Sequence, residues 1–227
     1  NLSSSVSYSR TFPKYPRVTI SLTSSLSQNK NTQSANLTLP TFQGNMERIY
    51  PFAKREGTKK GIIQNINFQL TTLAESRIQT SEEKLFTKAM YDDAVSGVSH
   101  SIPLATNFKV FKHLSVSAGG SYREIWTPNT IAYRDYNEVD GVVKDTIKGF
   151  DAFRTYNYSA SLGTTIYGTF NFKEGKKIQS IRHVVRPSIS YSTQPSFEKY
   201  YDTYIVDANG TTAEYTRFEN ALFGSPT

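Results

Sequence analysis

Four arginines in the sequence stand where their guanidinium groups could bind a phosphate or a carboxylate. Arg17, Arg123, Arg182 and Arg186 occupy the same alternate positions as the Ser, Thr and Asn residues around them. A guanidinium group binds both ligand types in a bidentate manner. We therefore expect these four side chains to face a hydrated interior. Pairing with acidic residues of a neighbouring strand or an inserted partner is the competing interpretation.

Catalytic and metal-binding patterns are weak in this chain. The Ser-x-x-Lys spacing of some acyl-transfer enzymes occurs at 27–30, 81–84 and 196–199, without companion motifs. The three histidines are isolated and lack a ligand spacing, and no glycine-rich phosphate loop is present. The acidic residues of 127–150 do not pair along one strand. We predict that the protein is not an enzyme and that it uses no metal and no cofactor.

The elements that position the arginines follow from a period-2 alternation, which is typical of β-strands. It is clearest in 153–172, where one face is apolar and the other carries hydroxyl, amide and glycine residues. Such a strand lies between an apolar and a wet environment. The residues that we expect to face lipid or to form an aromatic girdle are Trp126, Tyr156, Tyr158, Leu162, Ile166, Phe170 and Phe172.

Seven further segments follow the same rule, which gives eight predicted strands. The eight segments are 2–11, 17–27, 34–50, 61–74, 94–109, 113–126, 153–172 and 180–193. Short or moderate joins (12–16, 53–60, 109–113, 173–177) alternate along the chain with joins that are mostly longer (28–33, 75–92, 127–150, 194–227). In outer-membrane barrels short turns face the periplasm and long loops face outside. We therefore expect 75–92, 127–150 and 194–227 to be extracellular loops.

Two of the long joins carry hairpin signals of their own. Asp140-Gly141 and Asn209-Gly210 each lie between strand-like segments, and both dipeptides favour tight type I′ turns. These joins are predicted to rise as two-stranded ribbons above the sheet. By the same orientation, Tyr156 and Tyr158 are expected at the outer membrane interface and Phe170 and Phe172 at the periplasmic one.

Composition limits the remaining classes. Hydrophobic residues make up only 37% of the 227 residues while aromatics reach 13%, so that the chain lacks the aliphatic content of a conventional core. The net charge is +7 and there is no cysteine, but the basic residues are scattered and do not form the charged, aromatic-lined groove of a nucleic-acid-binding protein. We predict an all-β, antiparallel transmembrane β-barrel, of which residues 1–227 supply about eight strands of a larger barrel.

Two stretches carry a resemblance to a known family. "NLTLPTFQGNMERIYPF" (36–52) and "GVSHSIPLATNFKVFKHLSVSAGGSYREIW" (97–126) resemble the barrel domain of the LptD family, in a divergent branch. The resemblance implies a protein of the cell outer membrane that transports lipopolysaccharide and inserts it into the outer leaflet. It also implies an LptE-like lipoprotein plug, periplasmic bridge proteins that deliver lipopolysaccharide, and contact with outer-membrane lipids. A phosphorylated glycolipid would then be the ligand of the four arginines.

Other functions remain open from the residues alone. A porin or a nutrient receptor would show the same alternation, because both are outer-membrane barrels. An extracellular β-sandwich or adhesin also has alternating strands, although its strands usually run about five to six residues. The chain stops at "GSPT" without the terminal aromatic strand of a bacterial barrel, and we expect an interior portion of the barrel.

Overall fold

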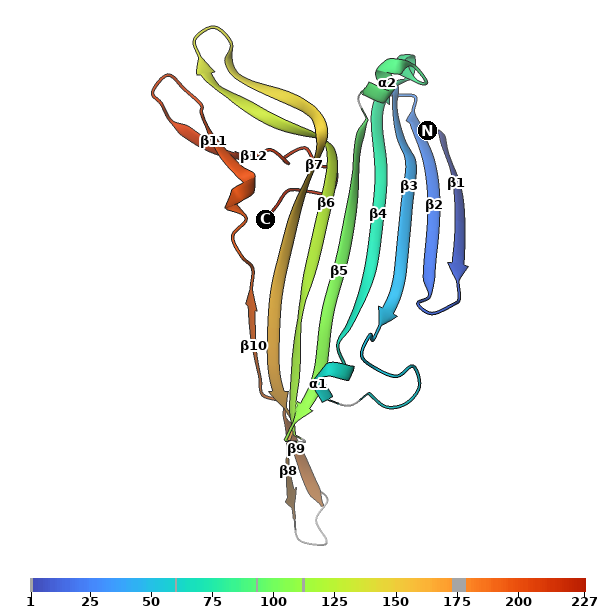
Figure 1. Cartoon of the computed structure of the whole chain (residues 1–227), viewed down its shortest axis with the longest axis vertical. Helices are drawn as coiled ribbons and strands as arrows, with labels where there is room; N and C mark the ends of the chain where they lie inside the picture. Colours follow the sequence, from blue (N-terminus) through green and yellow to red (C-terminus); the bar gives the residue numbers. More distant parts are fainter. Residues whose placement is uncertain (1, 60, 93, 112, 173–178) are drawn as a thin grey trace.

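The computed structural model describes residues 2–59, 61–92, 94–111, 113–172 and 179–227, and these residues are almost entirely β-strand and turn (Figure 1). The predicted join at 173–177 lies outside the described residues. None of the described helices is long and apolar enough to cross a membrane. The elements are β1 (Leu2–Phe12), β2 (Val18–Asn29), β3 (Ser34–Ile49), α1 (Gly61–Gln64), β4 (Asn67–Ser81), η1 (Glu82–Lys84), α2 (Lys88–Asp92), β5 (Val95–Val110), β6 (Leu114–Asn137), β7 (Gly141–Thr164), β8 (Ile166–Asn171), β9 (Ser180–Val185), β10 (Ser188–Thr193), η2 (Glu198–Tyr200), β11 (Tyr201–Ile205) and β12 (Thr212–Thr216).

Eight of the strands form one antiparallel sheet in the order β1-β2-β3-β4-β5-β6-β7-β10. The sheet is open, with β1 and β10 at its two edges. The joins after β1, β3, β5 and β7 lie at one end, which we call the turn end, and the joins after β2, β4, β6 and β10 lie at the other, the loop end (Figure 1). The predicted all-β antiparallel class and its eight strands are confirmed.

The register gives this sheet two chemically different faces. On one face Val116 pairs with Leu162, which pairs with Ile189. One residue along, Ser117, Ser161 and Ser190 pair across the same three strands on the opposite face. Because successive side chains of a strand point to opposite sides, the same division continues over the sheet. We call the side of Val116 the apolar face and the side of Ser117 the polar face.

Large apolar side chains stay exposed over the middle of the apolar face. The exposed fractions are 49% for Leu104, 57% for Tyr158 and 70% for Ile189. Monomeric soluble proteins rarely expose continuous apolar patches larger than a few hundred Å². No second sheet covers these side chains in the described part of the chain. This arrangement is the reverse of a soluble β-sandwich, in which the apolar faces of two sheets pack together.

The alternation placed one strand start wrongly. The strand predicted for 61–74 begins only at Asn67, and Gly61–Gln64 form the single-turn helix α1. Gly61 has a φ of +75°, in the left-handed region that glycine adopts most easily. The Asn65 side chain then donates a hydrogen bond of 2.6 Å to the Gly61 carbonyl. The strand also continues to Ser81, so that the following join starts later than the predicted 75.

Two predicted strands are each divided in two. The segment 153–172 is split at Thr165 into the end of β7 and β8, and 180–193 is split at Arg186 and Pro187 into β9 and β10. Proline cannot donate a ladder hydrogen bond, and the Pro187 carbonyl instead accepts one from the Thr164 backbone N–H at 3.1 Å. Beyond this break β8 and β9 pair only with each other, as a two-stranded sheet outside the large one (Figure 1).

Both predicted hairpins are present, but their turns are not of the predicted type. β6 and β7 continue together beyond the neighbouring strands and join through a turn at 138–140, where Asn137 pairs with Gly141. Gly141 and Gly210 have φ values of +66° and +81°, but Asp140 and Asn209 do not have a positive φ. A type I′ turn requires a positive φ at both central residues, so the predicted turn type is wrong at both positions. β11 and β12 pair on either side of Asn209-Gly210.

Buried side chains form two small clusters near the loop end instead of one central core. Met90 of α2 packs with Ala35, Leu37 and Ile78 on the apolar face of β3 and β4. The second cluster lies on the polar face of β6 and β7, against the C-terminal part of the chain. The sheet is therefore a single layer over most of its length, and the second cluster marks the place where another segment covers it.

Candidate functional site

Residues 194–224 cross the polar face of β6 and β7 near the loop end, and we call them the crossing segment. The segment includes η2, β11 and β12. It begins beside the free edge of β7, where the Arg154 backbone N–H donates a hydrogen bond of 3.0 Å to the Tyr200 hydroxyl. It ends over β5, where Leu222 and Phe223 lie against Gly97. The segment therefore spans the polar face from β7 to β5.

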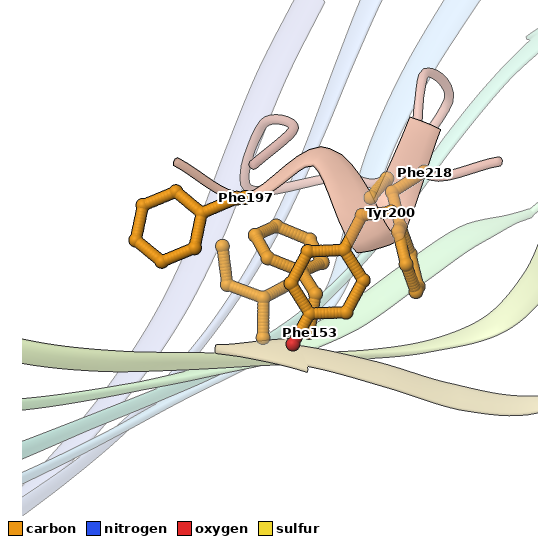
Figure 2. Close-up of a cluster of buried hydrophobic side chains, with 6 residues drawn as sticks. Phe153, Phe197, Tyr200 and Phe218 are labelled. Atoms are coloured by element: carbon orange, nitrogen blue, oxygen red, sulfur yellow. The ribbon is translucent and has the colours of Figure 1, made fainter. Parts of the chain in front are cut away.

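An aromatic cluster attaches the crossing segment to the sheet (Figure 2). Phe153 and Ile125 are neighbours on the polar face of β7 and β6, and both are buried. The Phe153 ring lies 4.8 Å from the Phe218 ring and 6.0 Å from the Tyr200 ring, between centroids. Phe197 completes the contact at the edge of β7. The Phe153–Tyr200 contact is edge-to-face, and a contact of this kind adds about 0.5–1.5 kcal/mol to the burial of the rings.

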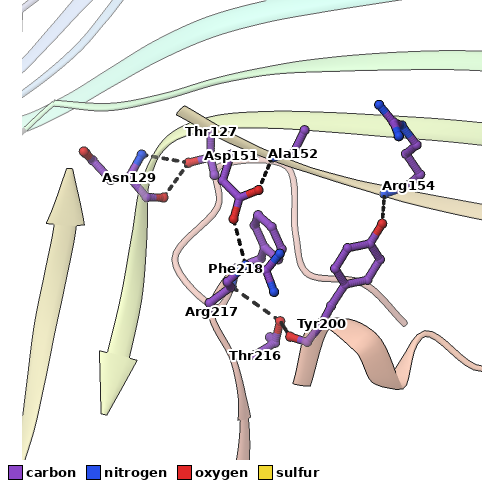
Figure 3. Close-up of polar contacts among 9 residues, drawn as sticks. All are labelled: Thr127, Asn129, Asp151, Ala152, Arg154, Tyr200, Thr216, Arg217 and Phe218. Atoms are coloured by element: carbon purple, nitrogen blue, oxygen red, sulfur yellow. Dashed lines mark hydrogen bonds and ion pairs between the residues drawn. The ribbon is translucent and has the colours of Figure 1, made fainter. Parts of the chain in front are cut away.

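Polar contacts surround this cluster (Figure 3). The Arg217 Nε donates to the Asp151 Oδ2 at 2.7 Å, and both side chains are about one-third exposed. The backbone is also engaged, because the Ile131 N–H donates to the Arg217 carbonyl at 3.0 Å. Within the segment, the buried Thr216 hydroxyl donates to the Tyr200 carbonyl at 2.8 Å. These bonds fix the position at which Phe218 enters the cluster.

The ribbon of β6 and β7 contacts the same segment further out. The Tyr133 and Tyr204 rings are stacked, with centroids 4.4 Å apart, and the Lys144 ammonium lies 3.0 Å from the Glu219 carboxylate.

At the tip of the β11–β12 hairpin, the Thr211 backbone N–H and hydroxyl donate to the Asp207 carboxylate. These hydrogen bonds lower the pKa of Asp207 below its ordinary value.

Between the crossing segment and the turn end, the polar face has a hollow that is lined by uncharged groups. A shallow hollow of about 510 Å³ is bordered by Asn107, Ser117, Ser161 and Ser190 and by the backbone at Gly119. Hydroxyl and amide groups of this kind both donate and accept hydrogen bonds. These groups can exchange hydrogen bonds with hydroxyl groups of a ligand such as a sugar, and they carry no charge.

The four arginines that the sequence singled out are not brought together. Arg123 lies on the polar face of β6, where its Nη2 donates to the Phe223 carbonyl at 2.7 Å. Arg17 precedes β2 and pairs with Glu47 at 3.3 Å, which is what the competing interpretation expects. Arg182 lies over the Tyr167 ring in the β8–β9 hairpin, and Arg186 is exposed between β9 and β10.

The predicted lipid-facing residues divide into two groups. Trp126, Tyr156, Tyr158 and Leu162 share the apolar face of the large sheet. Ile166 and Phe170 belong to β8, and Phe172 follows it, so that these three lie in the hairpin outside that sheet. The structure thus contains no continuous strand from Tyr156 to Phe172. Contact with lipid stays a prediction for both groups.

The sequence analysis did not predict the ion pair that lies on the apolar face. Arg154 Nη2 donates to Glu124 Oε1 at 3.2 Å, and Glu124 also accepts from the Tyr122 hydroxyl at 2.6 Å and from the Trp126 Nε1 at 2.9 Å. The signal was present in the alternation, since Glu124 has the same parity as Tyr122 and Trp126. A charge at such a position points to the boundary of an apolar surface rather than to its middle.

A glycine pair allows close strand packing below that ion pair. A Cβ atom on Gly119 would lie 2.6 Å from the Leu104 carbonyl oxygen, and one on Gly120 would lie 2.4 Å from the Asn157 carbonyl oxygen. On the apolar face the absent side chain of Gly120 opens a groove of about 790 Å³ beside Leu104 and Tyr158. The sequence signal was the Gly-Gly dipeptide within a strand, which often marks a close backbone approach.

An antiparallel sheet with an exposed apolar face and a hydroxyl-rich opposite face is typical of the wall of an outer-membrane β-barrel. Among the described residues no group of three or more His, Asp or Glu side chains is placed to hold a metal ion. A family model described as "LptD protein" matches residues 1–227. The chain therefore belongs to the LptD protein family, whose members act in lipopolysaccharide transport at the outer membrane. No curated protein and no solved structure matches the chain.

Proposed function

We propose that residues 1–227 form part of the wall of an outer-membrane barrel that inserts lipopolysaccharide into the outer leaflet. The observation that carries the proposal is the two-faced single-layer sheet in a chain of this family. The apolar face contacts lipid tails, and the polar face lines a hydrated lumen. The free edges of β1 and β10 pair with further strands, because an exposed strand edge is a site for pairing with another strand.

The polar face accommodates the sugar portion of lipopolysaccharide. Its serine and asparagine side chains exchange hydrogen bonds with sugar hydroxyls, and Arg123 supplies a positive charge beside the crossing segment. The chain performs no catalysis, and the energy for transport comes from outside it through periplasmic bridge proteins. An LptE-like lipoprotein occupies the lumen as a plug.

A crosslinking experiment tests the assignment of faces and ligand together. A photoreactive amino acid is placed at Ser117, on the polar face, or at Leu162, on the apolar face, in the complete protein during active transport. We expect adducts with the sugar region of lipopolysaccharide at Ser117 and adducts with lipid acyl chains at Leu162. An absence of lipopolysaccharide adducts at Ser117 would contradict the proposal.

The two alternative functions give different results. A porin or nutrient receptor conducts ions steadily in a planar bilayer and copurifies with neither lipopolysaccharide nor LptE. An extracellular β-sandwich or adhesin dissolves without detergent. The exposed apolar face argues against a soluble protein, because water would contact Ile189 and Tyr158 directly.

A further inference from the structure

The join between β3 and β4 combines exposed apolar and basic side chains. Residues 50–66 include Phe52, Ile62 and Ile63, which are 60%, 50% and 65% exposed. The same join contains four basic residues, Lys54, Arg55, Lys59 and Lys60, and one acidic residue, Glu56. Exposed apolar residues beside basic ones are typical of segments that lie in a membrane interface.

The helical part of this join lies on the apolar face of the sheet. The Thr106 hydroxyl donates to the Ile62 carbonyl at 2.9 Å, and Thr106 pairs with Ala118, a residue of the apolar face. Ile66 borders the apolar groove together with Leu104. α1 therefore turns outward from the strand ends, toward the side that contacts lipid in the proposed function, and does not fold under the lumen.

The basic side chains are held at the turn end by aromatic rings. The Arg55 guanidinium lies 4.8 Å from the Tyr15 ring centroid, and the Lys59 ammonium lies 4.0 Å from that of Tyr50. The Tyr50 backbone N–H donates to the Tyr15 hydroxyl at 3.4 Å, which joins this loop to the β1–β2 turn. Tyrosine is enriched at membrane–water interfaces, where its ring and its hydroxyl meet different environments.

We propose that residues 50–59 and 61–66 form an interfacial anchor that binds the phospholipid headgroups of the inner leaflet of the outer membrane. Ile62, Ile63 and Phe52 enter the boundary between headgroups and acyl chains, and Lys54, Arg55 and Lys59 contact the phosphates. The proposal rests on the proposed function, because it needs the apolar face in the bilayer and the turn end at the periplasmic side. The net positive charge of the loop and its continuity with the apolar face select a lipid surface as the occupant.

A crosslinking experiment in nanodiscs tests the anchor. The complete protein, with a photoreactive amino acid at Ile63, is placed in discs of phosphatidylethanolamine and phosphatidylglycerol, and adducts on the peptide containing position 63 are identified by mass spectrometry. We expect phospholipid adducts, with phosphatidylglycerol enriched over its share of the disc. A basic residue near an anionic surface changes binding roughly fivefold, so the triple variant Lys54→Gln, Arg55→Gln, Lys59→Gln should remove most of the enrichment. The matched variant Lys30→Gln, Lys84→Gln, Lys88→Gln, at the loop end, should leave it unchanged.

Position 162 separates failure of the anchor from failure of the proposed function. Lipid adducts at Leu162 but none at Ile63 would overturn the anchor and leave the barrel wall intact. Protein adducts at Ile63 in native outer membranes would also overturn it, because the occupant would be a protein. Absence of lipid adducts at both Leu162 and Ile63 would refute the proposed function itself. Enrichment that survives the triple substitution would refute the role of the charges.

Discussion

Replacing Phe218 by alanine removes the ring at the centre of the aromatic cluster that attaches the crossing segment. Phe218 is 1% exposed and contacts Phe153 and Tyr200 at ring-centroid distances of 4.8 Å and 5.7 Å. Truncation of a buried phenylalanine costs about 3–5 kcal/mol. Because the cluster lies between the crossing segment and the sheet, the loss falls on the attachment of the segment rather than on the strand ladder. The population of detached segment should rise roughly a hundredfold to several thousandfold, since each 1.4 kcal/mol is tenfold.

Hydrogen exchange measures the population of detached crossing segment directly, because a segment that opens locally exchanges its amides at a rate set by its own opening free energy. In Phe218→Ala, peptides from 197–224 should exchange at least about a hundredfold faster than in the wild type, under conditions in which the segment closes again faster than its exposed amides exchange. Peptides from 114–122 of β6 should exchange unchanged, because their amides pair with β5 and β7.

Phe150→Ala is the matched control. Phe150 lies in β7, but it is 73% exposed and contacts Trp126 on the apolar face. This variant should leave the exchange of 197–224 unchanged. Equal exchange in Phe218→Ala and the wild type would refute the attachment through this cluster. Faster exchange across all of β6 would show that the cluster supports the whole sheet.

Three other substitutions test different parts of the structure. Leu162→Arg should destabilise the folded barrel by about 2–4 kcal/mol if the apolar face lies in the bilayer, whereas Ser161→Arg should have little effect. Urea titration of the reconstituted protein measures the stability of both variants. Equal tolerance of the two substitutions would contradict the assignment of faces. Gly120→Ala should cost about 1–3 kcal/mol because its Cβ would meet the Asn157 carbonyl oxygen at 2.4 Å, while Gly163→Ala, with its nearest contact at 3.6 Å, should be tolerated in the same titration. The hydrogen bonds that lower the pKa of Asp207 stabilise the β11–β12 hairpin at pH values above the unfolded pKa of about 3.9. This stabilisation should be lost as the pH falls through the folded pKa. Hydrogen exchange of 201–216, corrected for intrinsic rates, should show the loss in the wild type and not in Asp207→Ala.

The sequence was sufficient to predict the large sheet because each strand residue faces one of two environments. Alternation located Val116 and Leu162 on one face and Ser117 and Ser161 on the other, and the register confirms both pairs. The same rule failed at Ile62 and Ile63, where two neighbouring apolar residues break the alternation and form α1. It also passed over Pro187, although a missing N–H within a strand pattern is a physical reason for a break.

The period-2 alternation could not predict where the crossing segment lies on the sheet. The hairpin at Asn209-Gly210 follows from local turn chemistry and was predicted. The attachment of Phe197, Tyr200 and Phe218 to Phe153 joins residues that lie more than forty positions apart, and no local pattern records which surface such aromatics will meet. Phe153 begins the predicted strand 153–172, and the alternation assigned no contact to it.

The ion pair of Glu124 and Arg154 sets the level of the crossing segment relative to the membrane in the proposed arrangement. On β6 the uncharged part of the apolar face runs from Leu114 to Tyr122, and a tilted strand crosses a bilayer in about 9–11 residues. The charges of Glu124 and Arg154 then fall at the outer interface, where their cost is smallest. Arg123, whose Nη2 binds the Phe223 carbonyl, lies at the same height on the polar face. In the proposed barrel the crossing segment would therefore narrow the lumen at and beyond the outer interface, and it would leave the serine-lined hollow uncovered at the depth of the acyl chains.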